Sequence, residues 1–285
     1  MTTIVMALDD WRPTRRMALR GLFATGAGAV AGRVGYSVAY ERHQVRLLES
    51  DVTVVGLPRG LDGLRVGLIT DTHSSATVPD EDILHAVQLL RDAAPDLVAL
   101  GGDYVTDMDT TRAVHSAELL SALTAAPLGA FAVLGNHDDD RVVPAALTAQ
   151  GFEVLRDQVT VRNIRGEAVA LAGVRYWTRR TAEIAKVLGG AGPTTFLLAH
   201  DPRRLAEAAQ LDVQLVLSGH THGGQVVLPG LGAIAARRFP VVAGTGTQGN
   251  CTVHVSRGVG TVVAPIRMNC PPEVSLLTLR SRSSF

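Results

Sequence analysis

Hydrophobic residues form short runs through most of the chain, and the segments between these runs show helical spacing. The runs predict buried strands at 64–70, 96–100, 130–134, 194–199 and 213–217. Apolar residues at helical spacing predict helices at 79–94, 110–125, 142–150, 181–188 and 203–211. Strands that alternate with helices along a chain form a parallel sheet covered by helices. We therefore expect an α/β fold.

Two regions depart from this alternation. Between 153 and 176, apolar and polar residues alternate in short runs, which predicts antiparallel strands joined by tight turns. From 223 to the end, we expect only short strands separated by glycine turns. The whole pattern predicts one mixed α/β domain.

Potential ligands follow directly after five of the hydrophobic runs: Asp71 and His73, Asp103, Asn136 and His137, His200, and His220 and His222. In open α/β sheets, ligand sites lie outside the carboxyl ends of the strands, so residues far apart in sequence can meet there. Taken singly, Asp103 and Asn136 could be turn residues and His200 a histidine of the core. Five such coincidences are improbable, so we expect one common site.

The types of ligand narrow the chemistry of this site. Carboxylates, an amide and imidazoles, without thiolates, suit divalent ions such as Mn, Fe or Zn. The ligands are too many for one four-coordinate ion and sufficient for two ions that share a carboxylate. Paired ions activate water against a phosphoryl centre. The sequence therefore predicts a site with two divalent metal ions.

The same residues fall into an ordered series of motifs: Asp71-x-His73, Gly102-Asp103, Gly135-Asn136-His137-Asp138, His200 and Gly219-His220-Thr221-His222. This series resembles the signature of the calcineurin-like metallophosphoesterases, over roughly residues 51–279. The resemblance implies a four-layer α/β/β/α sandwich in which two mixed sheets lie between helices. A catalytically silent protein-binding scaffold on the same fold is the alternative, although every motif residue is present here.

The resemblance also implies a role for each residue. One ion would be bound by Asp71, His73, Asp103 and His222, and the other by Asp103, Asn136, His200 and His220. Asp103 would then bridge the ions, and a bridging hydroxide would attack phosphorus. His137 would assist the leaving group, and Asp138 would orient the ring of His137.

A closer similarity is to the bacterial membrane-associated phosphodiesterase branch. It is carried by 61–65, 219–225, 256–260, 265–267 and 271–273. Some members of that branch carry twin-arginine signals, and related enzymes cleave the pyrophosphate of UDP-diacylglucosamine. This similarity implies a phosphodiester or pyrophosphate substrate, and it suggests a substrate that is linked to a lipid. Where relatives have an acidic segment, this chain has Arg175-Tyr176-Trp177, which could bind substrate or could simply be a packed aromatic pair beside a solvated arginine.

The amino-terminal residues have the pattern of an export signal. Arg15-Arg16 precedes an uncharged stretch at 21–32 that contains the small-residue site Ala29-Val30-Ala31. The segment resembles a twin-arginine signal, with Ala18 where phenylalanine is usual. We expect a signal peptide or an uncleaved anchor at 1–32, a connector at 33–50 and the phosphoesterase domain at 51–285. The expected location is the outer face of the cytoplasmic membrane, with a membrane surface as a partner.

Composition adds two constraints. The 27 basic and 27 acidic residues balance, and no long basic run is present, so a nucleic-acid partner is not favoured. Cys251 and Cys270 are the only cysteines, and in an exported protein they could form a disulfide or remain two buried thiols.

Overall fold

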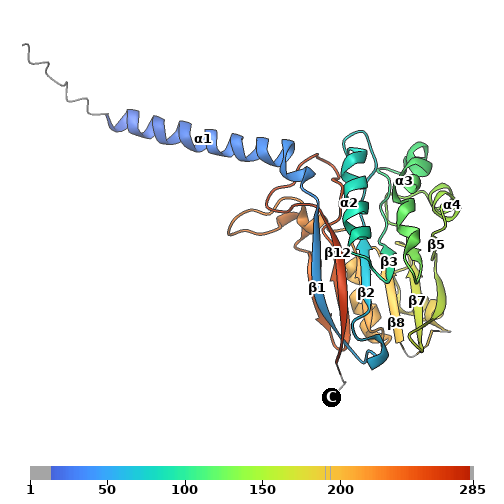
Figure 1. Ribbon diagram of the computed structural model, residues 1–285. Helices are drawn as coiled ribbons and strands as arrows, with labels where there is room; N and C mark the ends of the chain where they lie inside the picture. Colours follow the sequence, from blue (N-terminus) through green and yellow to red (C-terminus); the bar gives the residue numbers. More distant parts are fainter. Residues whose placement is uncertain (1–13, 190, 193, 283–285) are drawn as a thin grey trace, which may run out of the picture.

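The computed structural model describes residues 14–189, 191–192 and 194–282. Two six-stranded sheets stack face to face (Figure 1). The first contains, in spatial order, β1 (Arg46–Val55), β12 (Glu273–Arg282), β2 (Arg65–Ile69), β3 (Leu97–Leu100), β4 (Ala130–Ala132) and β5 (Glu153–Val154). The second contains β10 (Gly244–Gln248), β11 (Cys251–Val255), β9 (Leu215–Ser218), β8 (Thr194–Ala199), β7 (Glu167–Val174) and β6 (Gln158–Ile164).

Both sheets are mixed. In the first, β12 is parallel to β1 and antiparallel to β2, and β2 to β5 run parallel. In the second, β7, β8, β9 and β11 run parallel, with β6 and β10 antiparallel at the two edges. The predicted sandwich of two mixed sheets is confirmed.

Helices cover the outer face of each sheet. The first sheet packs against α2 (Asp80–Asp92), α3 (Ala113–Leu120) and α4 (Val142–Ala149), and the second against α5 (Thr181–Leu188) and α6 (Leu205–Gln210). A third apolar core lies between the sheets and contains Leu68, Phe131, Phe196 and Leu217. Short 3-10 helices lie at Glu41–His43, Arg59–Leu61, Thr110–Arg112, Ser121–Ala125, Pro202–Arg204, His222–Gly224 and Ile234–Ala236.

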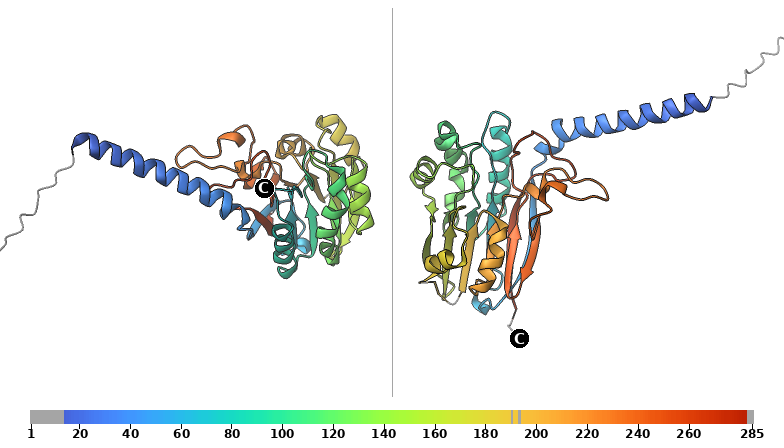
Figure 2. Two further views of the ribbon diagram at one scale, coloured as in Figure 1. Left: turned by 90° about the horizontal axis from the view of Figure 1, so that it is seen from above. Right: turned by 180° about the vertical axis from the view of Figure 1, so that it is seen from behind.

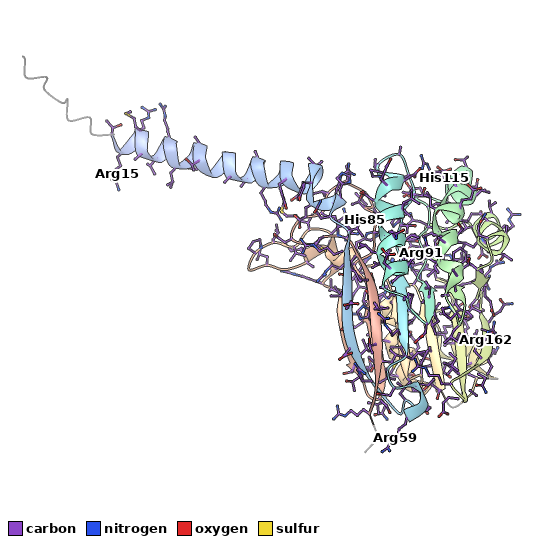
Figure 3. All side chains as sticks on the ribbon, in the orientation of Figure 1. Arg15, Arg59, His85, Arg91, His115 and Arg162 are labelled. Carbon is purple, nitrogen blue, oxygen red and sulfur yellow. The ribbon has the colours of Figure 1, made fainter. Side chains whose placement is uncertain are left out.

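The amino-terminal helix α1 (Arg15–Ala39) projects away from the sandwich (Figure 1). Arg15 lies at its far tip (Figure 3). Among the described residues, no helix is both long and apolar enough to cross a membrane. The part of the predicted signal segment at 1–13 lies outside the described residues. The predicted connector at 33–50 contains the end of α1, a 3-10 helix and the start of β1, so it contributes directly to the first sheet.

Three details of the predicted fold are wrong. The segment 110–125 is not one helix, because α3 is flanked by 3-10 turns on both sides. Of the strands between 153 and 176, β6 and β7 form the expected antiparallel hairpin, but β5 pairs in parallel with β4 in the other sheet. The region after 223 contains the long strand β12, which lies between β1 and β2 in the sheet.

Cys251 and Cys270 are both buried, and both are free thiols. Of the two alternatives for these cysteines, the structure therefore shows the buried thiols and not the disulfide.

Candidate metal centre

The predicted ligands meet where the carboxyl ends of strands from both sheets lie together. The first sheet contributes Asp71 and His73 after β2, Asp103 after β3 and Asn136 after β4; the second contributes His200 after β8 and His220 and His222 after β9. Hydrogen bonds tie these loops together. The backbone N–H of Asp71 donates to the carbonyl of Gly102 at 2.8 Å, and the N–H of His220 donates to Asp71 Oδ2 at 3.0 Å.

The backbone at this site is strained. Five ligand residues have positive φ angles, between 47° and 69°: Asp71, His73, Asp103, His220 and His222. This region is unfavourable for residues with a side chain, and such strain is concentrated at functional sites. The loops also need glycine where they approach one another. A Cβ atom on Gly135 would lie 2.0 Å from Oδ1 of Asp103, so any other residue there would displace that carboxylate.

The first group of ligands consists of Asp71, His73 and His222, all buried. The Nε2 atoms of His73 and His222 are 3.1 Å apart, and Nε2 of His222 is 3.4 Å from Oδ1 of Asp71. Burial lowers the pKa of His73 to about 4 and holds the pKa of His222 well below its usual value. Both rings are therefore neutral near pH 7, which is the form that binds a metal ion.

The second group consists of Asp103, His200 and His220. Nε2 of His200 is 3.1 Å from both Oδ2 of Asp103 and Nδ1 of His220. Burial alone would lower the pKa of His200, but the charge of Asp103 and its hydrogen bond raise it to about 10. In the protein without ions, a proton on His200 thus balances the Asp103 carboxylate. A divalent cation can take the place of that proton.

Asp103 lies between the two groups. Its Oδ2 atom is 3.1 Å from Nε2 of His200 and 3.6 Å from Nε2 of His73. Burial would raise the pKa of Asp103, but the charge of His200 lowers it below its usual value, so the carboxylate is ionised. The geometry thus places a single negative oxygen within reach of both groups, as a shared ligand requires.

Asn136 provides an independent test of whether the site fits a cation. Its Oδ1 atom is buried and has no hydrogen-bond partner among the described residues. An unsatisfied buried amide oxygen is costly, and coordination of a metal ion would satisfy it. The residues present therefore fit two divalent ions, with Asn136 available as an oxygen ligand.

His137 lies beside the first group. Its ring packs edge-on against the ring of His73, with 5.0 Å between centroids, and its side chain is 22% exposed. The backbone N–H of Asp107 donates to Nδ1 of His137 at 3.1 Å. Oδ1 of Asp107 also lies 3.3 Å from Nδ1, so Asp107 occupies this ring nitrogen with two groups, and Nε2 is the ring nitrogen left for other partners. His137 is thus a partly accessible donor at the edge of the site.

Asp138 does not orient the His137 ring, and that prediction is wrong. The carboxylate of Asp138 instead accepts backbone N–H groups of Asp103, Tyr104 and Gly135, at 2.7 to 2.8 Å. The side chain is buried, and burial raises its pKa to about 7. Asp138 therefore holds the strained loop of Asp103 in place, and the group at Nδ1 of His137 is Asp107.

Two further predictions concern the segment after β7. Arg175 forms ion pairs with Asp157 and Asp140, so its charge is compensated within the protein. The ring of Tyr176 is 5.4 Å from the ring of His220. Trp177 packs edge-on against Tyr176 while remaining 66% exposed. The aromatic pair therefore borders the second ligand group, whereas Arg175 is directed to other partners.

Arg267 is a site residue for which the sequence reasoning predicted no function. Its side chain is completely buried, and Nη1 donates to the backbone carbonyl of His222 at 3.2 Å. Nη2 donates to the carbonyls of Gly258 and Gly260. Burial lowers the pKa of Arg267. An arginine that lies within a largely apolar segment, as at 262–267, is the sequence signal that could have identified it.

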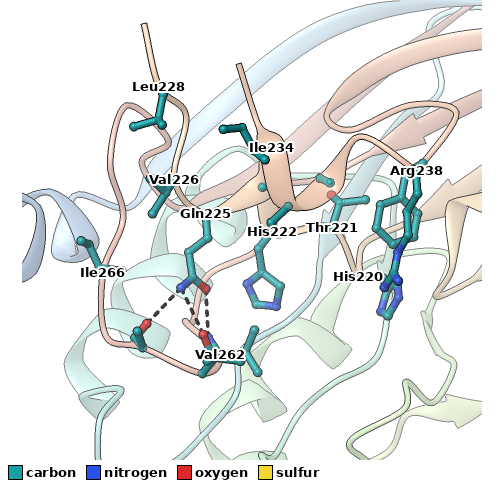
Figure 4. Close-up of a pocket in the computed structure, with 16 residues that line it drawn as sticks. His220, Thr221, His222, Gln225, Val226, Leu228, Ile234, Arg238, Val262 and Ile266 are labelled. Atoms are coloured by element: carbon teal, nitrogen blue, oxygen red, sulfur yellow. Dashed lines mark hydrogen bonds between the residues drawn. The ribbon is translucent and has the colours of Figure 1, made fainter. Parts of the chain in front are cut away.

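A groove of about 640 Å³ opens beside the ligands (Figure 4). His220 and His222 are among its lining residues. The remaining lining is mainly aliphatic and includes Val226, Leu228, Ile234, Val262 and Ile266. A ligand with a polar group at the metal centre could therefore extend an apolar portion along this groove.

Comparisons with known proteins agree with this geometry. The calcineurin-like phosphoesterase model matches residues 64–224, which is more than half of the chain. The uncharacterized metallophosphoesterase YkuE of Bacillus subtilis is 29% identical over 280 residues, which cover 94% of this chain and 98% of that protein. Phosphodiesterase YaeI of Escherichia coli is 32% identical over 227 residues, which cover 75% of this chain and 82% of that protein.

Similarity to solved structures is weaker. A dimetal phosphatase from Danio rerio is 12% identical, with a TM-score of 0.42, and the match covers 70% of this chain and 88% of that one. The family match covers the strand ends that carry the two ligand groups. The chain therefore belongs to the calcineurin-like phosphoesterase family and is a metal-dependent phosphoester hydrolase.

Proposed function

We propose that the chain hydrolyses a phosphodiester or pyrophosphate bond in a lipid-linked substrate. The observation that carries the reaction type is Asp103, a buried ionised carboxylate within reach of both ligand groups. When bound, two ions would activate water and neutralise charge on the phosphoryl oxygens. The scaffold alternative gives no reason for so many buried ligands on strained backbone.

The residues of the site would have two functions: to bind the ions and to assist the leaving group. Asp71, His73 and His222 would hold one ion, and His200, His220 and Asn136 the other, with Asp103 shared. His137 would donate the proton on Nε2 to the leaving oxygen. Asp107 supports this by contacting Nδ1 with its backbone N–H at 3.1 Å and its Oδ1 at 3.3 Å, which orients the ring of His137.

The groove supports the lipid-linked part of the proposal. It begins at His220 and His222 and continues along aliphatic side chains, so it provides an apolar environment next to the reacting phosphorus. Burying one methylene group stabilises binding by about 0.8 kcal/mol. A substrate with an acyl chain would gain this energy, whereas a small soluble phosphoester would not. The name of the Escherichia coli relative, a phosphodiesterase, supports a diester.

A matched pair of substrates tests this function. We expect the Mn-loaded protein to cleave a diester with a long alkyl chain at a higher kcat/KM than its short-chain analogue with the same leaving group. Ile266→Ser should reduce this difference by making the groove more polar. Equal rates for both chain lengths in the wild type would contradict the lipid-linked assignment without affecting the assignment of a diesterase.

The reaction type is tested separately with Asp103→Asn, which removes the shared charge. We expect it to lose both ions and nearly all activity. Asp109→Asn is the matched control, because Asp109 is only partly buried and its side chain bonds only within its own turn. One tightly bound ion in fully active wild-type protein would contradict the model of two ions.

A further inference from the structure

Two loops project beside the mouth of the groove, and we call them together the lip: residues 226–239 and 261–266. They are connected to each other and to the site. The side-chain amide of Gln225 donates to the carbonyls of Val262 and Ala264, and its Oε1 accepts the N–H of Val262 (Figure 4). Gln225 also accepts the N–H of Met268 at its backbone carbonyl. The lip is thus an ordered extension of the chain that carries His222.

The tips of the lip are unusually apolar for an exposed surface. Val263 is fully exposed, at 102%, and Leu231 and Ile234 are 57% and 47% exposed. Val263 also has a φ angle of +66°, a conformation that is unfavourable for a β-branched residue. Val263 is therefore unfavourable in two ways: its backbone is strained, and its aliphatic side chain is exposed to water. A partner that buries Val263 would remove the unfavourable exposure to water.

The charged residues near these tips in sequence are all basic. No acidic residue occurs between Asp212 and Glu273, and this whole interval contains the lip. Arg237 and Arg238 are exposed next to the tips, and Arg237 Nη2 donates to the carbonyl of Leu231 at 2.8 Å. Aliphatic tips with adjacent guanidinium groups match a layer that is apolar inside and carries phosphates at its surface.

We propose that the lip docks into a lipid surface that contains anionic phospholipids. The side chains of Val263, Leu231 and Ile234 enter the acyl layer, and Arg237 and Arg238 contact the phosphates. A protein partner fits less well, because the exposed tips are aliphatic, and leucine and valine are under-represented among the most strongly binding residues of protein interfaces. Phe239, at the end of the first lip loop, is partly buried and packs edge-on against the ring of His220.

The position of α1 supports the same orientation. In all three views, α1 and the lip loops project from the same side of the sandwich (Figures 1 and 2). α1 carries exposed apolar side chains, among them Leu22 and Phe23. A lipid surface would therefore meet both features on one side of the domain. If the substrate is lipid-linked, as the proposed function states, this docking would let its acyl chain enter the groove directly from the lipid layer.

The test is binding of the full chain to vesicles, with no substrate turnover required. The probe is sedimentation with vesicles of equal parts phosphatidylglycerol and phosphatidylcholine. We expect Val263→Asp and Leu231→Asp each to weaken binding about tenfold, because each loses the burial of one aliphatic side chain and adds a charge. Arg237→Gln with Arg238→Gln should weaken binding to anionic vesicles and leave binding to pure phosphatidylcholine unchanged.

Val114→Asp is the matched control. Val114 is 55% exposed, close to the value for Leu231, but lies on α3 in the outer helix layer. All variants retain α1, so any lipid binding by α1 is common to them. Equal losses in Val114→Asp and the lip variants, or no loss in the lip variants, would overturn the proposal.

Two other results separate docking from its alternatives. If the wild type is a dimer that Val263→Asp converts to a monomer while vesicle binding is unchanged, a second copy covers the lip and the proposal is wrong. Turnover of soluble bis-nitrophenyl phosphate reports the proposed function independently. A chain that binds vesicles through the lip but hydrolyses no diester would retain the docking proposal and refute the function.

Discussion

The buried guanidinium of Arg267 donates a hydrogen bond to the backbone carbonyl of His222 at 3.2 Å. The same side chain holds the carbonyl of Gly260, and the N–H of Gly260 donates to the carbonyl of Asp71 at 2.7 Å. Arg267 thus connects the two loops that carry the first ligand group. It contacts no reacting atom in this arrangement, so it acts as a positioning residue.

Arg267→Met should lower stability and weaken metal binding together. Methionine is of similar length and donates no hydrogen bond, so the carbonyl of Gly260 loses its donor. The carbonyls of His222 and Gly258 lose one donor and keep the backbone N–H groups of Gln225 and Glu273. One unsatisfied buried carbonyl costs about 1–3 kcal/mol, and we expect a loss of stability of that order. Urea unfolding of the metal-free protein measures the first effect, and Mn titration measures the second.

Arg280→Met is the control for this change. Arg280 is half-exposed and pairs with the exposed Asp51, so its loss should change stability by less than about 0.5 kcal/mol. Normal metal affinity in Arg267→Met, despite lower stability, would show that Arg267 supports the fold alone.

Asn136→Ala should separate metal binding from stability in a different way. The Oδ1 atom of Asn136 is buried without a partner, so its removal should leave the metal-free protein as stable as the wild type, or more so. With Mn present, the wild type should gain more in melting temperature than the variant, because only the wild type offers this ligand. Equal gains in both proteins would exclude Asn136 from the coordination.

The positions of the ligands could be predicted because each follows a hydrophobic run that ends abruptly. β3 ends at Leu100, and Asp103 follows within a glycine loop. Burial of the runs requires that the strands lie in a sheet, and the alternation with helices makes the strands parallel. The ends of parallel strands then come together without any knowledge of side-chain contacts.

The contacts made by Asp138 could not be predicted in this way. Asp138 follows His137 in sequence, and adjacency suggested a contact between their side chains. The turn after β4 instead directs the carboxylate to the N–H groups of Asp103 and Tyr104. These N–H groups are placed by the positive φ angle of Asp103, and no hydrophobic pattern encodes such a backbone angle.

The sequence did not predict β12, because polar residues are buried in this strand and interrupt its hydrophobic pattern. Glu273 and Ser275 lie in the buried half of the strand, which therefore does not read as a hydrophobic run. Each is satisfied by a distant partner: Arg257 pairs with Glu273, and Nε2 of His254 is 3.1 Å from the hydroxyl of Ser275. Such compensation depends on tertiary structure and leaves no local signal.

The amino-terminal segment is predicted to direct export by the twin-arginine route. Changing Arg15 and Arg16 together to lysine keeps the charge but removes the guanidinium pair that the route recognises. We expect the variant to remain in the cytoplasm, as measured by cell fractionation with an antibody to the domain. Arg33→Lys, near the other end of α1, is the control and should be exported normally. Unchanged fractionation of the double variant would refute this route.

The last prediction concerns His137, for which the structure suggests a test sharper than simple loss of activity. An alkoxide is a poor leaving group and needs a proton as its bond to phosphorus breaks, whereas nitrophenolate needs little such help. General acid assistance contributes roughly 10² to 10⁴ in rate. His137→Ala should therefore lose far more kcat/KM on an alkyl diester than on bis-nitrophenyl phosphate, at equal metal content.

The environment of His137 supplies the matched variants for this test. Asp138→Asn should show no selectivity between the two substrates, because the Asp138 carboxylate holds the Asp103 loop and not the His137 ring. It should instead reduce metal content and both rates together. Asp107→Asn removes the charge of the carboxylate that lies 3.3 Å from Nδ1 of His137 and keeps the backbone N–H at the positive φ angle of this position, so it should give a milder form of the His137→Ala selectivity. Equal losses of His137→Ala on both substrates would mean that His137 stabilises charge on the phosphoryl oxygens, and its leaving-group role would be wrong.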